Sequence, residues 1–399
     1  MGDILFLAHR VPYPPDRGDK IRSWHILKAL CAQHNVHVAA LCDDNRDMAH
    51  LRFLNRHAAT IAVFPRTIER DEASIKALLF GGSASVRAFA SRDLAAYVRD
   101  VLDEQEISTV FAFSGQMAQF VPKQLGGRRF IMDFVDMDSA KYMEWGAGSD
   151  LNARANRFEA RRLFAFERAT AKRATVSTFV SAAEAALFRD ATGLGTDKVR
   201  VLENGIDLEH FAPNAVTGAL NPNLITFTGQ MDYAPNVDAV CAFVRTTWPM
   251  VKAKNPHAHF AIVGRNPTAD VLALASDPTI SVTGEVPDTR VWLKQAAVVV
   301  APLKLARGVQ NKVLEAMAMG KAVVASSAAA EGIDARAGRD LVVVDEDEDE
   351  QGAVAAAIVH LMQNPADAEK IGYAARVQME ARYGWDAQLA GLNELVDMK

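Results

Sequence analysis

The chain has 399 residues, of which 50% are hydrophobic and 23% are charged, and its formal net charge is −5. This length exceeds what one ordinary hydrophobic core supports, so two domains are expected, and the weak net charge gives no reason to expect nucleic acid as a partner. The three cysteines, Cys31, Cys42 and Cys241, show no CxxC spacing, which argues against a disulfide framework or a structural zinc site. No apolar run approaches the roughly 20 residues of a membrane span, so we expect a cytoplasmic protein, attached at most to the inner face of the plasma membrane.

In the first half of the chain, short apolar runs alternate with longer amphipathic stretches, a pattern typical of a parallel sheet covered by helices. Strands are predicted at residues 3–8, 36–41, 59–64, 109–113, 130–135 and 176–180. Helices are predicted between them, including 20–33 and 92–104.

The second half of the chain repeats this scheme. Strands are predicted at 224–228, 259–263, 280–283, 298–301, 322–325 and 341–344, and helices at 237–254, 288–295, 311–319 and 352–363. A stretch of poor helix and strand formers, with the turn signal Asn204–Gly205, separates the two halves. We therefore predict an α/β protein with two Rossmann-like domains, at 1–203 and 223–380, joined by a linker at 204–222 and followed by a helical segment at 381–399. Such domains bind ligands at the carboxyl ends of their strands.

Charged residues gather where the predicted strand 298–301 ends and the next helix begins. Gly308 lets the backbone approach a ligand closely, and the free amides at the start of a helix suit a phosphate. Arg307 and Lys312 add two positive charges at this end, and Glu315 can accept hydrogen bonds from ribose hydroxyls. The segment predicts a nucleoside diphosphate site, although a plain βαβ crossover with surface charges would give a similar pattern.

Four segments, in this order, resemble the retaining GT-B glycosyltransferases of family four. They are 202–207 (LENGID), similar to the interdomain element, 227–236 (FTGQMDYAPN), similar to the first strand and loop of the C-terminal domain, 284–288 (GEVPD), similar to the loop that holds the base, and 297–326, similar to the donor-binding segment. The sequences at 133–139 and 307–312 resemble the subgroup associated with exopolysaccharide and PEP-CTERM (exosortase) systems.

The resemblance implies which ligand each domain binds. The acceptor would bind the domain at 1–203, the nucleotide sugar would bind the domain at 223–380, and the helix at 381–399 would return to the N-terminal domain. The implied activity is transfer of a sugar from a nucleotide-diphosphate donor to a saccharide or lipid-linked acceptor, with retention and with no metal cofactor. The donor-binding residues that it implies are Gly18, Asp19, Gly229, Arg265, Val286, Gly308, Val309 and Gln310.

One position departs from the family. Relatives usually carry a glutamate eight residues before the helix glutamate, and this chain has Arg307 there. An arginine accepts no hydrogen bond, but it can clasp a β-phosphate or a carboxylate on the donor sugar. We expect Arg307 and Lys312 to neutralise the departing nucleoside diphosphate. A nucleotide-sugar 2-epimerase of the same fold and a non-catalytic sugar-nucleotide-binding scaffold remain alternatives.

In the first half, Asp136 follows the predicted strand 130–135, where a carboxylate could orient or partly deprotonate an acceptor hydroxyl. The predicted catalytic set is therefore Asp136, Arg307, Lys312 and Glu315. Asp136 and Asp138 also spell the DxD of metal-dependent transferases, which leaves a metal site as a second interpretation.

The segment 154–173 carries seven basic residues interleaved with aromatic and aliphatic ones. It predicts an amphipathic helix that either rests on an anionic membrane surface or packs on its own domain with a solvated basic face. Packing on its own domain is the favoured interpretation.

Overall fold

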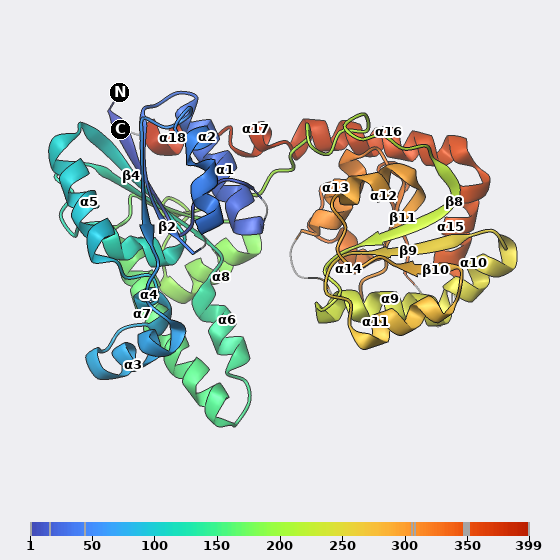
Figure 1. Ribbon diagram of the computed structural model, residues 1–399, viewed down its shortest axis with the longest axis horizontal. Helices are drawn as coiled ribbons and strands as arrows, with labels where there is room; N and C mark the ends of the chain where they lie inside the picture. The colour runs from blue at the N-terminus through green and yellow to red at the C-terminus, as the bar shows by residue number, and fades with distance from the viewer. Residues whose placement is uncertain are drawn as a thin grey trace. The chain divides into compact units, whose positions relative to one another are not determined.

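The computed structural model describes residues 2–15, 17–43, 45–304, 306, 309–345 and 352–397. Two compact units are formed (Figure 1). The first comprises Met1–Asn204 with Gln388–Lys399, and the second comprises Gly205–Ala387. The second unit thus begins at Gly205, and residues 205–222, predicted as a linker, are part of it.

Within the described residues, the first unit holds a seven-stranded parallel sheet in the order β3-β2-β1-β4-β5-β6-β7. The strands are β1 Asp3–Ala8, β2 Val36–Cys42, β3 Thr60–Pro65, β4 Ile107–Phe113, β5 Arg129–Val135, β6 Val176–Phe179 and β7 Val199–Val201. Strand order reverses between β1 and β4, so ligands are expected where these two strands end.

Helices cover both faces of this sheet, with α1 and α5 on opposite sides (Figure 1). Their bounds are α1 Gly18–Cys31, α2 Leu51–Leu54, α3 Arg70–Phe80, α4 Ala84–Arg87, α5 Arg92–Glu104, α6 Asp138–Trp145, α7 Leu151–Arg173, α8 Ala182–Thr192 and α18 Leu392–Asp397, with 3-10 helices η1 Asn45–His50 and η2 Gly115–Phe120. Helix α5 shows why these segments are helical. Its start is capped by the Ser91 side chain, and it buries Leu94, Val98, Val101 and Leu102 at a helical spacing.

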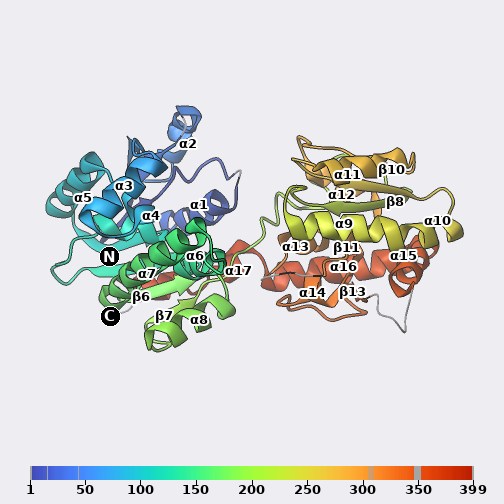
Figure 2. The ribbon, with the colours of Figure 1, turned by 90° about the horizontal axis from the view of Figure 1, so that it is seen from below.

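The second unit holds a six-stranded parallel sheet, again counted over the described residues, in the order β10-β9-β8-β11-β12-β13. The strands are β8 Asn221–Thr228, β9 His259–Val263, β10 Ile280–Val282, β11 Ala296–Ala301, β12 Val323–Ala325 and β13 Val342–Val343. The helices are α9 Ala234–Thr246, α10 Trp248–Lys254, α11 Ala269–Ala273, α12 Thr289–Gln295, α13 Asn311–Ala318, α14 Ser327–Ala330, α15 Ala353–Gln363, α16 Pro365–Arg382 and α17 Trp385–Gln388, with the 3-10 helix η3 Leu274–Ser276. The sheet lies between α9 and α16 (Figure 2), and the strand order reverses between β8 and β11.

Each predicted strand is confirmed to within a few residues, and two parallel-sheet Rossmann-like units confirm the predicted α/β class. The predicted single helix at 237–254 is wrong, because Thr247 separates α9 from α10 and Pro249 occupies the first turn of α10. The short strand β7 and the helix α3 were not predicted.

Candidate functional site

The loop that follows β8 and the loop that follows β9 approach each other closely at two glycines. A Cβ atom at Gly264, whose φ is +153°, would lie 1.6 Å from the carbonyl oxygen of Gly229, so only glycine allows this approach. The Met231 amide donates to the carbonyl of Arg265 at 2.9 Å, and the Arg265 guanidinium donates to the side chain of Gln230 at 3.1 Å. Gly229 and Arg265, predicted from distant parts of the sequence, therefore meet in one pair of loops.

Lys312, in the first turn of α13, extends towards the Gly229 loop. Its Nζ atom donates a hydrogen bond to Oδ1 of Asn236 and lies 4.5 Å from the centre of the Phe227 ring. The Asn236 amide in turn donates to the carbonyl of Gln230 at 2.9 Å. The ammonium group is thus held beside the end of β8, the strand next to β11, where the strand order reverses.

Burial changes the ionisation of both predicted charged residues of α13. It lowers the pKa of Lys312 to about 8, although Glu315 opposes this shift. Burial raises the pKa of Glu315 to about 7, against the opposing effect of Lys312. An incoming phosphate would restore the full charge of Lys312. Because the pKa of Glu315 is about 7, its carboxyl group can either accept a hydrogen bond from a hydroxyl group or donate one to it.

The start of α13 adds a partial positive charge to this site. The side chain of the cap residue, Gln310, makes no capping hydrogen bond at this start. The first amides of the helix therefore suit a phosphate. Val309 precedes Gln310 and packs partly on the core of the unit, whereas Arg307 and Gly308 lie outside the described residues.

Val286, predicted to lie in the base-holding loop, is anchored to the core of the second unit. Its side chain packs with Trp292 against the buried cluster of Leu224, Ala261 and Val263. The neighbouring Gly284, at φ +67°, gives the backbone of this loop a conformation that residues with side chains rarely adopt.

In the first unit, Asp19 is held by positive and polar groups near the end of β1. The His9 ring bonds it at 3.1 Å, Arg10 at 2.7 Å and Arg17 at 2.9 Å. Burial alone would raise the pKa of Asp19, but the His9 hydrogen bond and the two arginines hold it well below its usual range. Gly18 opens helix α1, and a Cβ atom there would meet nothing within 4 Å. Gly18 therefore has open space beside it.

Asp136 follows a strained turn at the end of β5. Val135 has φ +70° and Ser114, at the end of the neighbouring strand β4, has φ +75°; both are unusual for residues with a side chain and concentrate at functional sites. The Lys141 Nζ atom donates to Asp136 at 2.6 Å and to Asp138 at 3.2 Å. Burial would lower the pKa of Lys141, but Asp138 and Asp136 raise it above its ordinary value. The DxD carboxylates are thus paired with an ammonium group.

A cavity of about 1040 Å³ opens beside these residues, entirely within the first unit. Its polar wall comes from the carboxyl ends of strands β1 to β5 and includes Arg10, Asp43, Arg66, Asp138 and Lys141. Asp43 accepts hydrogen bonds from Arg10, at 2.7 Å, and from Arg66. Tyr142, Trp145 and Phe158 add an aromatic wall, and such a cavity can bind a polar molecule that also has an apolar face.

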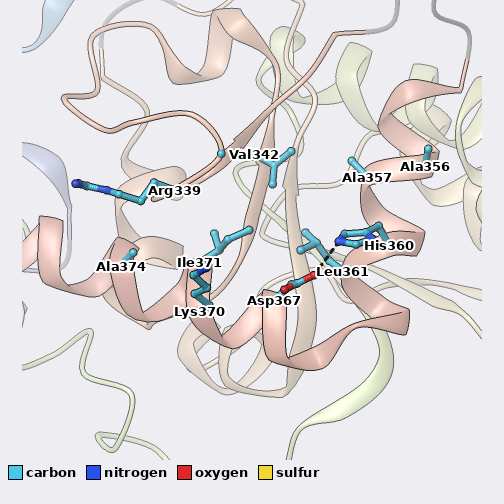
Figure 3. Close-up of a pocket in the computed structure, with 11 residues that line it drawn as sticks. Arg339, Val342, Ala356, Ala357, His360, Leu361, Asp367, Lys370, Ile371 and Ala374 are labelled. Atoms are coloured by element: carbon cyan, nitrogen blue, oxygen red, sulfur yellow. Dashed lines mark hydrogen bonds and ion pairs between the residues drawn. The ribbon is translucent and has the colours of Figure 1, made fainter.

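Another cavity, of about 610 Å³, lies between α15 and α16 in the second unit (Figure 3). It borders the edge strand β13 rather than the reversal between β8 and β11, and aliphatic side chains such as Val342, Leu361 and Ile371 point into it. His360 is paired with Asp367 at 3.0 Å on its wall. This cavity lies away from the Lys312 site and contains none of the predicted site residues.

Sequence reasoning missed the partners that hold these groups. Asn236 and Phe227 position Lys312, and both lie in the segment 227–236, whose resemblance to the family could have pointed to them. The network of Arg10, Asp43 and Arg66 could have been suspected because each charge follows the end of a strand.

Two searches for other kinds of site concern the described residues only. No group of three or more His, Cys, Asp and Glu side chains is placed to hold a metal ion among them. No helix in the described ranges has the length and apolar character needed to cross a membrane.

Comparison with known proteins finds a matching family model in the second half of the chain. The family model for "Glycosyl transferases group 1" matches residues 222–364. A lipopolysaccharide core biosynthesis mannosyltransferase, LpcC of Rhizobium leguminosarum bv. viciae, is 32% identical over 146 residues. That match covers 33% of this chain and 40% of the relative, so the chain matches less than half of that protein.

Solved structures are similar over almost the whole chain. Sucrose-phosphate synthase from Thermosynechococcus elongatus superposes with a TM-score of 0.66 at 18% identity, over 98% of each chain. HepE from Anabaena, solved in complex with UDP and glucose, gives a TM-score of 0.64 at 15% identity over 100% of each chain. The protein therefore has the GT-B fold of two Rossmann-like domains. Lys312 and Glu315 lie within residues 222–364, the stretch that matches the glycosyl transferases group 1 model.

Proposed function

We propose that the protein is a glycosyltransferase that moves a sugar from a nucleotide-diphosphate donor to a saccharide or lipid-linked acceptor. The observation that carries this proposal is the position of Lys312, held by Asn236 beside Gly229 at the reversal of strand order in the second sheet. HepE, which shares the fold, is bound to UDP and glucose in its structure, and LpcC is a mannosyltransferase. The resemblance to exopolysaccharide-associated transferases supports a role in exopolysaccharide or glycoconjugate synthesis.

In the proposed reaction, the bond between the anomeric carbon of the donor sugar and a phosphate oxygen breaks, and negative charge develops on the departing diphosphate. Lys312 and the first amides of α13 stabilise this charge, together with Arg307. Glu315 accepts hydrogen bonds from the ribose, while Gly229, Arg265, Gln310 and the backbone near Val286 shape the rest of the donor site. Fixed positive groups take the role that a metal has in other transferases, so we propose transfer without a metal.

The acceptor side of the reaction is assigned to the first unit. The acceptor oxygen forms a new bond to the anomeric carbon, and the proton of its hydroxyl passes to the departing phosphate oxygen when configuration is retained. Asp136, fixed by Lys141, orients this hydroxyl. Gly18 and Asp19 are proposed to line the donor phosphate, and the cavity between β1–β5 and the aromatic wall receives the acceptor.

The proposal is tested by screening UDP-, GDP- and ADP-sugars for a rise in melting temperature, followed by turnover assays with the preferred donor. A ligand bound only by the folded protein stabilises it by RT ln(1 + [L]/Kd), so the preferred donor stands out. Lys312→Ala and Arg307→Ala are each expected to lower turnover at least a hundredfold. Lys321→Ala is the matched control, because burial also lowers the pKa of Lys321 to about 8, but this lysine lies beyond the other end of α13.

Each alternative gives its own result in the same assays. Formation of an epimer from donor alone would mark a 2-epimerase, and tight donor binding without turnover under any acceptor would mark a non-catalytic scaffold. Turnover that excess chelator abolishes would replace the metal-free mechanism with one that uses a metal at Asp136 and Asp138.

We also propose that residues 154–173 contact an anionic membrane surface. This segment lies in α7, where Arg157, Arg162 and Arg173 donate to backbone carbonyls of their own unit. The remaining basic side chains, Arg154, Arg161, Arg168 and Lys172, are exposed. The helix therefore packs on its own unit with one set of basic residues, and the other set is available to the proposed membrane contact.

A further inference from the structure

Helix α3 exposes its large apolar side chains to solvent and buries small ones, the reverse of an ordinary surface helix. It packs on the first unit through Ala73 and Ala77, which are buried, while Ile75, Leu78 and Leu79 on its outer side are 59%, 72% and 69% exposed. Phe80, at its end, is 73% exposed. Burial of side chains of this size ordinarily stabilises a protein. The fold does not use this apolar surface.

Helix α7 carries the second component, a row of positive charge. Arg154, Arg161, Arg168 and Lys172 follow one another at spacings of seven, seven and four residues, which places them on one face of the helix. The acidic residues of α7, Glu159 and Glu167, are buried and accept hydrogen bonds from the starts of α4 and α6. The exposed row is therefore purely cationic.

The apolar surface and the cationic row adjoin each other. The Arg162 guanidinium of α7 donates to the carbonyl of Ala77 in α3 at 2.6 Å and lies 3.9 Å from the centre of the Phe158 ring. Phe158 is 46% exposed, and Leu151, at the start of α7, is 81% exposed. Figure 1 shows α3 and the adjoining ends of α6 and α7 at the same lower end of the first unit.

Trp145 and Met143, at the end of α6, extend the apolar part, with exposed fractions of 58% and 47%. Large aliphatic and aromatic side chains beside arginines and lysines are the composition of surfaces that lie in the interface of a bilayer. Since the chain as a whole is negative, at −5, the cationic row is a local feature and not a consequence of composition.

We propose that the outer side of α3 inserts into the surface of an anionic phospholipid bilayer, with the cationic row of α7 resting on the headgroups. The membrane contact then has two parts, an apolar one at residues 75–80 and an electrostatic one at residues 154–172. The acidic residues Asp71 and Glu72 lie in the first turn of α3, so the end of the helix near Phe80 is the inserted end.

This surface also borders the cavity of the first unit, because Leu78, Trp145 and Phe158 line both. An acceptor anchored in the bilayer could therefore enter the cavity from the membrane side. This last step rests on the proposed transferase function, whereas the membrane contact itself does not.

The test is co-sedimentation of the full chain with phosphatidylcholine vesicles that contain or lack phosphatidylglycerol, at low and high salt. The unmodified protein is expected to pellet with the phosphatidylglycerol vesicles and to be released by salt. Ile75→Ser/Leu79→Ser/Phe80→Ser, which leaves the cavity-lining Leu78 in place, should weaken binding at least tenfold and leave the remainder sensitive to salt. Arg154→Gln/Arg161→Gln/Arg168→Gln should weaken binding and remove both the salt effect and the preference for phosphatidylglycerol.

Leu187→Ser/Leu272→Ser is the matched control, because these two leucines are 46% and 52% exposed and lie outside this surface. It should bind vesicles as the unmodified protein does, and the melting temperature of all three variants should stay close to the original, since only exposed side chains change. Binding that ignores phosphatidylglycerol, or that survives the α3 substitutions, would overturn the proposal. So would a dimer in vesicle-free sedimentation that the α3 substitutions dissociate, because the apolar surface would then cover a second copy of the chain.

Turnover with a water-soluble acceptor separates this proposal from the proposed function. The α3 variant should retain that turnover while losing vesicle binding. A chain that binds vesicles as predicted but transfers no sugar would refute the transferase and leave the membrane surface intact.

Discussion

The charge of Lys312 depends on pH near neutrality, because burial lowers its pKa. This residue is a phosphate-binding candidate that burial holds at a pKa of about 8, next to a Glu315 whose pKa is raised to about 7. A nucleoside diphosphate should bind the ammonium form of Lys312. In protein molecules whose Lys312 is neutral, binding should therefore be accompanied by uptake of a proton. In the free protein the neutral fraction of Lys312 becomes large as the pH rises through about 8.

The affinity for UDP should therefore fall above pH 8, approaching about tenfold per pH unit. Isothermal titration calorimetry between pH 6.5 and 9.5 measures this slope. Lys312→Arg keeps the charge at every pH in this range, so it should flatten the profile. Lys321→Ala should preserve the slope, and a flat profile for the unmodified protein would show that Lys312 does not meet the phosphate.

Sequence pointed to Lys312 and Glu315 as donor-site candidates, because both lie in a helix that follows a buried strand. It could not identify what holds them. The contact of Lys312 with Asn236 joins residues 76 positions apart, and the approach of Gly264 to Gly229 depends on how two loops close after β8 and β9. Such contacts follow from tertiary packing, which leaves no periodic pattern in the sequence.

At the scale of elements, the buried strands were the most predictable feature, because parallel strands covered on both faces appear as continuous apolar runs. Short or atypical elements were missed for physical reasons. Strand β7 has only three residues and an arginine at its centre. Helix α3 buries only small residues, Ala73 and Ala77, so its pattern does not point to a core-facing helix.

Helix α7 shows how one element organises others. Its buried Glu159 accepts hydrogen bonds from the amides of Ala84 and Ser85 at 2.9 Å each, at the start of α4. Its buried Glu167 accepts from the amide of Ser139 at 3.1 Å, at the start of α6. Two carboxyl groups on α7 thus fix the helices that line the first cavity.

Burial raises the pKa of Glu167 to about 8, although its hydrogen bonds with Ser139 oppose the shift. A carboxyl whose pKa is higher in the folded state than in the unfolded state binds its proton more tightly when folded. Its stabilising effect is therefore complete at low pH and is lost as the pH rises from about 5 to about 8.

Glu167→Gln should remove this loss, which amounts to at most about 1.4 kcal/mol per pH unit. Urea unfolding of the first unit at pH 5, 6, 7 and 8 measures it as the difference between the two proteins. The variant should gain stability relative to the original as the pH rises. Parallel stability profiles would show that Glu167 titrates at its ordinary pKa.

At the scale of the whole molecule, the chain completes its first unit with residues from its far end. After the second unit, Gln388–Lys399 belong to the first unit, where α18 contacts α1 and β5. Leu392, Leu395 and Val396 of α18 are buried, and Arg129 of β5 donates a hydrogen bond to the carbonyl of Val396. The second unit, Gly205–Ala387, is by contrast one continuous stretch of chain.

A chain that ends at Ala387 should therefore lose stability in its first unit alone. Removal of three buried aliphatic side chains costs about 1.5–3 kcal/mol each, so the loss should reach several kcal/mol. Differential scanning calorimetry with and without UDP assigns the transitions, because UDP should raise the melting temperature of the second unit. Truncation should lower the other transition and leave the UDP-dependent shift unchanged, with Leu392→Ala as a milder variant of the same effect. If truncation instead lowered the UDP-sensitive transition, α18 would stabilise the second unit and the division of the chain at Gln388 would be wrong.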